Sequence, residues 1–115
     1  MHEVSLVQAL FDQADRAIGD HARRDVRHVT VRIGELAGVE NDLFATAFEA
    51  CRGERGYGDA TLAIVREEAA WVCGSCGASA IAPGSLRCGR CDGAARLVRG
   101  GDIFLDRLEL EVVDV

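Results

Sequence analysis

Two stretches, Cys73-Gly74-Ser75-Cys76 and Cys88-Gly89-Arg90-Cys91, decide how the second half of this chain folds. Each stretch holds two cysteines three positions apart, and eleven residues separate the pairs. Two thiolates on one tight turn can point at the same ion, and two such turns brought face to face complete a tetrahedron. Residues 71–99 show no helical or strand period long enough to build a core of their own. We therefore predict a structural Zn(II) held by four ligands: Cys73, Cys76, Cys88 and Cys91.

The local composition supports this metal site. Gly74, Gly77 and Gly89 can take backbone angles that let amides point at the sulfurs, and Asp92 tolerates the left-handed region. The alternative is a pair of redox-active dithiols. A thioredoxin-like pair, however, occurs singly at a strand-to-helix junction of a βαβ unit, and neither pair here has that context. Zinc bound by four thiolates has no open position for a reacting water, so its role would be structural.

The flanking sequence predicts two helices and three strands. A helix is expected over residues 4–18, with an apolar stripe that includes Val4 and Val7, and a second from Asn41, with Leu43 and Phe44 on its apolar face and Gly53 or Gly56 at its end. The fifth cysteine, Cys51, shares that face and is interpreted as a small buried hydrophobe. Strands are expected over residues 29–33, 60–66 and 103–112, and the last shifts its apolar phase near residues 106–107.

These elements define an α+β fold, with two helices packed on a three-stranded sheet and a four-cysteine zinc-knuckle domain inserted before the last strand. Hydrophobic residues make up 49% of the 115 residues and charged residues 28%, a globular composition. No apolar run reaches the roughly 18 residues that a membrane-spanning helix needs. The start Met1-His2-Glu3 has no basic region ahead of an apolar segment, so we expect a soluble, cytoplasmic protein without a signal peptide or membrane association.

The first residues suggest a second metal site. With histidine as the second residue, the terminal amine, the backbone nitrogen of residue 2 and the imidazole can form fused chelate rings around one cation. Such a nitrogen-rich planar set suits Ni(II) or Cu(II) better than zinc. Glu3 adds negative charge and a further candidate ligand. The alternative is that His2 and Glu3 are solvated residues at a fraying chain end, as most terminal residues are.

Three features together resemble one protein family. They are the start Met1-His2-Glu3, the segment Ile33-Gly34-Glu35-Leu36-Ala37-Gly38-Val39-Glu40, and the two cysteine pairs before a terminal strand. In this order, and over essentially the whole chain, they resemble the HypA/HybF family of nickel-incorporation factors for hydrogenase maturation. Some members have histidines beside the cysteine pairs, whereas this sequence has none within residues 71–99. An exchange of zinc ligands driven by pH or by nickel is therefore not expected here.

The resemblance implies a metallochaperone without catalytic turnover. It implies a nickel-binding α/β domain over residues 1–70 and 100–115 and a zinc-binding domain over residues 71–99. Nickel would be a transient cargo held by Met1, His2 and Glu3, and zinc would be a resident structural cofactor. The implied partners are the GTPase HypB and the hydrogenase large subunit, and some family members also serve urease.

Two other classes of function remain as alternatives. A zinc-ribbon adaptor for nucleic acid or protein is suggested by four arginines against one aspartate in residues 71–99. The remainder of the chain carries a formal charge of -9 within a total of -6, a poor electrostatic match for a phosphate backbone. An enzyme would need a nucleophile, a base or an open metal position, and no such constellation is evident. A thiol oxidoreductase is the least unfavourable version of that alternative.

Overall fold

The computed structural model describes residues 2–78 and 86–112 and divides the chain into two compact units. The first unit consists of residues 1–32, 38–65 and 103–115, and the second of residues 33–37 and 66–102. Two of the four unit boundaries, after residues 32 and 65, fall inside strands β1 (Val26–Gly34) and β2 (Thr61–Glu67). Neither helix of the described residues is long and apolar enough to cross a membrane.

Two amphipathic helices form one layer of the first unit. Helix α1 spans His2–Ile18 and helix α2 spans Asn41–Arg52, so both predicted helices are confirmed. The short 3-10 helix η1, Arg23–Asp25, leads into β1. Between the helices the ring of Phe11 stacks on Phe48 at 5.2 Å and on Tyr57 at 5.0 Å. Cys51 is buried on the inner face of α2, as its place on the apolar stripe predicts.

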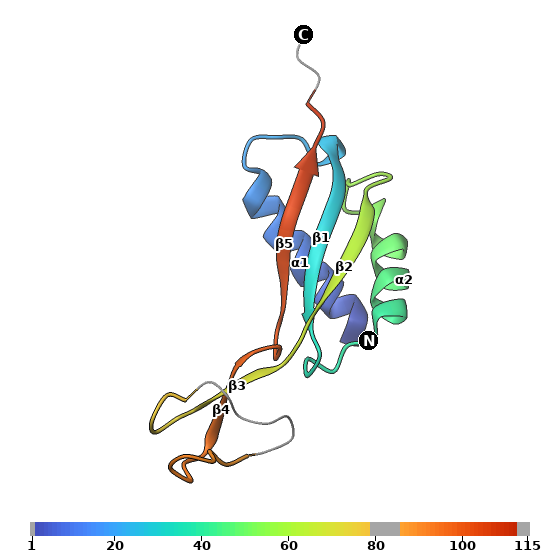
Figure 1. Cartoon of the computed structure of the whole chain (residues 1–115). Coiled ribbons are helices and arrows are strands. Elements are labelled where there is room, and N and C mark those ends of the chain that lie inside the picture. The colour runs from blue at the N-terminus through green and yellow to red at the C-terminus, as the bar shows by residue number, and fades with distance from the viewer. Residues whose placement is uncertain (1, 79–85, 113–115) are drawn as a thin grey trace. The chain divides into compact units, whose positions relative to one another are not determined.

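A three-stranded sheet in the order β2-β1-β5 forms the other layer, with α1 and α2 on one of its faces (Figure 1). Strand β5 spans Ile103–Leu110. It runs antiparallel to β1, because Gly34 donates to Asp102 at one end of the pair and Glu111 donates to Asp25 at the other. Along β5 the half-buried positions change phase at Asp106 and Arg107, where the sequence predicts the shift. The α+β architecture is confirmed.

The second unit contains a hairpin that periodicity alone does not predict. Strand β3, Ala70–Cys73, pairs antiparallel with β4, Ala95–Arg99, with Trp71 opposite Leu97 and Cys73 opposite Ala95. Both strands are too short for an alternation of apolar residues to stand out. The register shifts between Ala70 and Trp71, which shows that a bulge or similar irregularity interrupts the pair there.

Close backbone packing joins residues 33–37 to the ends of this hairpin. Gly34 donates to the carbonyl of Asp102 at 2.8 Å, and Leu36 donates to the carbonyl of Gly100 at 2.9 Å. A Cβ atom on Gly34 would lie 2.2 Å from the carbonyl carbon of Gly100. The carboxylate of Glu35 accepts a hydrogen bond from the amide of Ala69 at 2.6 Å. Gly34 is thus required because the backbone of Gly100 passes too close for a side chain.

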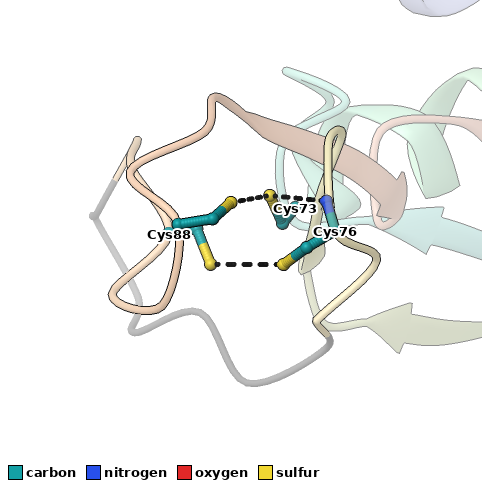
Figure 2. Close-up of side chains that lie close together, drawn as sticks. Cys73, Cys76 and Cys88 are labelled. Atoms are coloured by element: carbon teal, nitrogen blue, oxygen red, sulfur yellow. Dashed lines mark hydrogen bonds between the residues drawn. The ribbon is translucent and has the colours of Figure 1, made fainter.

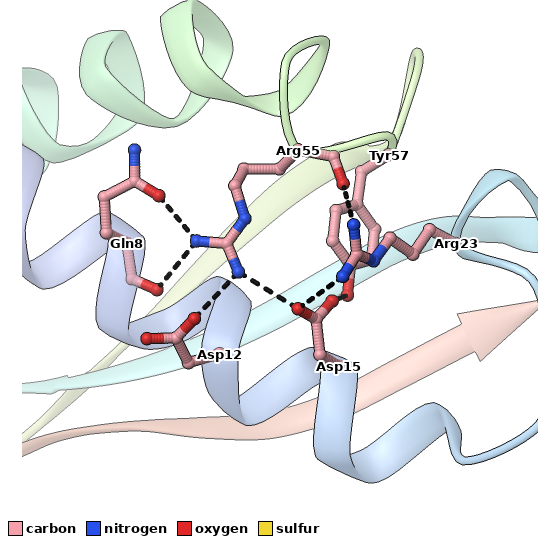
Figure 3. Close-up of polar contacts among 6 residues, drawn as sticks. All are labelled: Gln8, Asp12, Asp15, Arg23, Arg55 and Tyr57. Carbon is pink, nitrogen blue, oxygen red and sulfur yellow. Dashed lines mark hydrogen bonds and ion pairs between the residues drawn. The ribbon is translucent and has the colours of Figure 1, made fainter.

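A polar network connects the loop after α2 to α1 (Figure 3). The guanidinium of Arg55 donates to Asp12 at 2.8 Å and to Asp15 at 3.0 Å, and it lies 5.5 Å from the centre of the Phe11 ring. Tyr57 donates its hydroxyl hydrogen to Asp15 at 2.5 Å. Burial alone would raise the pKa of Asp15, but the hydrogen bonds from Tyr57 and Arg55 and the positive charges of Arg23 and Arg55 outweigh it and lower the pKa.

We predict that Gly34→Ala destabilises the protein by at least about 1–3 kcal/mol, because the new methyl group overlaps a backbone that cannot move aside. The matched control is Gly53→Ala, since Gly53 has helical angles and open space around its Cβ position. Thermal unfolding followed by circular dichroism measures both variants. Equal midpoints for Gly34→Ala and the native protein would contradict the crossing.

We predict that Asp15→Asn costs about 1–3 kcal/mol at neutral pH, the range for hydrogen bonds to a charged group. A carboxyl whose pKa is lowered by folding stabilises the fold above its unfolded pKa, near 3.8, and loses that contribution as the pH falls further. The difference between native protein and Asp15→Asn, measured by urea unfolding, should therefore shrink below pH 3.8. Asp12→Asn is the control, because Asp12 is 60% exposed and its ion pair should contribute under about 1 kcal/mol.

Candidate metal centres

The four predicted cysteine ligands come together in the second unit. One sulfur from each of Cys73, Cys76, Cys88 and Cys91 lies within 4.8 Å of the other three. The Cys73 and Cys91 sulfurs are 3.3 Å apart. Those of Cys76 and Cys88, which face one another in Figure 2, are 3.8 Å apart. A tetrahedral ion with metal–sulfur bonds of about 2.3 Å requires sulfurs about 3.8 Å apart. The donor set therefore fits one thiophilic ion.

Backbone amides support the negative charge of the sulfurs. The amides of Ser75 and Cys76 each lie 3.3 Å from the Cys73 sulfur, and the amide of Arg90 lies 3.3 Å from the Cys88 sulfur. The bonds from Cys76 and Ser75 lower the pKa of the Cys73 thiol to about 6. In contrast, the hydrogen bond with Cys73 raises the pKa of Cys91 to about 12. Without a cation the cluster thus ionises unevenly, and a bound metal would displace the remaining protons.

Local backbone features position the two turns. Cys73 is the last residue of β3, and the hairpin partner β4 begins four residues after Cys91. Gly77 and Asp92 have positive φ angles of 76° and 59°, as the sequence predicts, whereas Gly74 and Gly89 are not among the described residues with positive φ. Gly93 is a residue that sequence reasoning missed. A Cβ atom there would lie 2.9 Å from the Cys73 sulfur, so only glycine lets the second turn approach the first.

The predicted N-terminal site is described only in part, because Met1 lies outside the described residues. His2 and Glu3 begin α1, with side chains 59% and 23% exposed. The Nδ1 atom of His2 lies 3.1 Å from a carboxylate oxygen of Glu3. The two side chains therefore already face one another at the accessible end of the helix. His21 and His28 are exposed elsewhere on the first unit, and Nδ1 of His28 contacts the hydroxyl of Thr61.

The fold and the cysteine cluster together define a small α+β metal-binding protein with a tetrathiolate centre. Comparison with known proteins identifies the family within this class. A sequence model of the HypA family, described as "Hydrogenase/urease nickel incorporation, metallochaperone, hypA", matches residues 1–110. The chain belongs to this family of nickel metallochaperones, which serves hydrogenase maturation.

Relatives and solved structures agree over nearly the full chain. The hydrogenase maturation factor HypA of Shewanella halifaxensis is 34% identical over 113 residues, covering 96% of this chain and 98% of the relative. That of Wolinella succinogenes is 31% identical and covers 99% and 98%. The solution structure of the nickel metallochaperone HypA from Helicobacter pylori aligns with a TM-score of 0.74 at 29% identity, over 94% of this chain and 96% of that one.

Cys76→Ser should remove one thiolate and leave an incomplete tetrahedron. We expect metal affinity to fall by more than the ~10–100-fold that supporting residues around a metal contribute. We also expect the emission of Trp71, half-buried on β3, to shift to the red as the unit disorders. Metal content by mass spectrometry and tryptophan fluorescence measure the two effects. Cys51→Ala, a cysteine outside the cluster, should keep the full metal content; unchanged metal and emission in Cys76→Ser would exclude the site.

Proposed function

We propose that this protein binds Ni(II) through Met1, His2 and Glu3 and helps to insert it into the large subunit of a [NiFe]-hydrogenase. The observation that carries the proposal is the placement of His2 and Glu3, side by side and accessible at the first turn of α1, in a chain of the HypA family. Met1 would contribute its free amine. We assign nickel to the domain of residues 1–70 and 100–115 and a structural zinc to residues 71–99.

The local backbone is compatible with a nitrogen chelate. The first amides of an α-helix have no intrahelical acceptor, so the amide of His2 can lose its proton without breaking a helical hydrogen bond. Nδ1 of His2 is the ring nitrogen that faces Glu3. Replacing that contact by a bond to the metal leaves the carboxylate beside the ion. Amine, amide and imidazole nitrogens would then form the planar set that Ni(II) favours.

The helix also tunes the proposed affinity. A divalent cation at the start of α1 meets the positive end of the helix dipole, which opposes binding unless ligating amides lose protons. The terminal amine must also lose a proton, from a reference pKa of about 7.7–8.0. Binding should therefore strengthen with rising pH and remain moderate near neutrality. Moderate binding suits a cargo that is released by ligand exchange.

We assign Zn(II) to the cluster of Cys73, Cys76, Cys88 and Cys91. Soft thiolates select ions such as zinc, and four of them leave no open position on the metal. The ion would therefore be a resident structural cofactor rather than the cargo or a catalyst. Reduced thiolates also favour the cytoplasm as the compartment. We infer that the exchange partners are the GTPase HypB and the hydrogenase large subunit; the family's description includes urease as a second destination.

Nickel titration of four proteins tests the proposal. They are the native protein, a version extended by a few residues before Met1, His2→Ala, and His21→Ala as a control at another exposed histidine. We expect the extension and His2→Ala to weaken nickel binding by more than about tenfold, because each removes a chelate ring, while His21→Ala binds normally. Zinc content and helical signal should persist in all four. Equal nickel uptake by all four would overturn the assignment.

A further inference from the structure

An apolar groove with a volume of about 200 Å³ opens between the start of α1 and the exposed side of α2. Figure 1 places the N-terminal end of α1 beside α2 within the first unit. The lining is formed by residues from both helices: Glu3, Val4, Leu43, Thr46, Ala47 and Ala50. Almost all of its surface is apolar, and Glu3 supplies the charged group.

The groove exists because two apolar stripes continue past the point where the helices cover one another. Periodicity assigns Val4 and Leu43 to the inner faces of their helices, but Val4 is only half-buried and Leu43 is 50% exposed. Their neighbours in the same stripes, Val7 and Phe44, are fully buried. Val4 and Leu43 therefore lie on the apolar faces that the sequence indicates, at positions where those faces are not fully covered. Both side chains contribute apolar surface to the lining of the groove.

The edge of the groove is acidic. On α2 the exposed residues Asp42 and Glu49 precede and follow Thr46 by about one helical turn, so both lie next to this lining residue on the helix surface. Glu3 closes the end on α1. None of the described residues that line the groove is basic. A complementary occupant therefore presents one apolar side chain flanked by basic residues.

The groove adjoins the residues that we assign to nickel. Glu3 lines the groove and also contacts Nδ1 of His2 at 3.1 Å. An occupant of the groove therefore contacts Glu3, one of the proposed nickel ligands, and lies next to His2. For nickel to move by ligand exchange, the ligands of the receiving protein must come this close to His2.

We propose that this groove is the docking site of the nickel-receiving protein, the hydrogenase large subunit, which inserts an apolar side chain flanked by basic residues. This inference rests on the proposed function, because it takes the receiving protein from it. Filling the groove from the side of α2 should prevent docking while all three proposed nickel ligands are kept, although one of them, Glu3, lies at the end of the groove. Loss of its acidic edge should slow association and weaken the salt dependence of binding.

The test measures binding of the purified large-subunit precursor to the full-length protein by biolayer interferometry. Ala50→Phe fills the groove from an exposed position, and Ala17→Phe is the matched control on an exposed position of α1 outside the groove. We expect Ala50→Phe to weaken binding at least about tenfold, as expected when a central pocket is blocked, and Ala17→Phe to bind normally. Leu43→Ser is a second variant that removes a half-exposed side chain from the lining. The paired change Asp42→Asn with Glu49→Gln should reduce the association rate at low salt.

Nickel titration separates this proposal from the one on which it rests. Ala50→Phe should bind nickel as the native protein does, with unchanged helical signal. If the native protein binds no nickel at its N-terminus, the proposed function fails whatever the groove does. If nickel binds but Ala50→Phe and Leu43→Ser both retain native affinity for the large subunit, the docking site is wrong. The alternative occupant is a second copy of the chain, which presents Leu86 and Val98 beside arginines. If the native protein sediments as a dimer and Ala50→Phe as a monomer, the second copy is the occupant and the proposal is overturned.

Discussion

Four sulfur atoms within 4.8 Å of one another cannot all carry a negative charge unless a cation lies among them. The second unit depends on this constraint, because its two short strands and its turns offer little apolar surface of their own. The amides of Cys76 and Ser75 lower the pKa of Cys73, and the amide of Arg90 lowers that of Cys88. In contrast, the hydrogen bond with Cys73 raises the pKa of Cys91. A metal ion among the sulfurs compensates the remaining negative charge and couples binding to folding of the unit.

The two candidate metal sites differ in the accessibility of their ligands, which decides whether a bound ion is retained or exchanged. In the cysteine cluster, Cys73 and Cys88 are buried and all coordination positions of a tetrahedral ion are filled by the protein. At the start of α1, the side chains of His2 and Glu3 are 59% and 23% exposed and so are accessible to another protein. An ion held in the first arrangement stays, whereas an ion in the second can be exchanged. The proposed division between resident zinc and travelling nickel follows from this contrast.

In the first unit, the middle and the C-terminal half of α1 make the contacts that hold this helix in place. Phe11 packs against Phe48 and Tyr57, and Arg55 covers the same ring while bonding to Asp12 and Asp15. These contacts fix the middle and the C-terminal half of α1 against the chain after α2. The first turn of α1 is left beside an open groove instead. A stable helix body with an uncovered N-terminal turn is suited to present a chelate to another protein.

The sequence by itself determined the two helices, the three-stranded sheet, the phase shift in β5 and the identity of the four cysteines that cluster. Each of these depends on spacing along one segment, and spacing is visible in a sequence. Tertiary structure alone decided the β3–β4 hairpin, the need for glycine at positions 34 and 93, and the incomplete burial of Val4 and Leu43. Those features depend on which distant segment approaches a residue and how far two helices overlap, and periodicity within one segment carries no information about either.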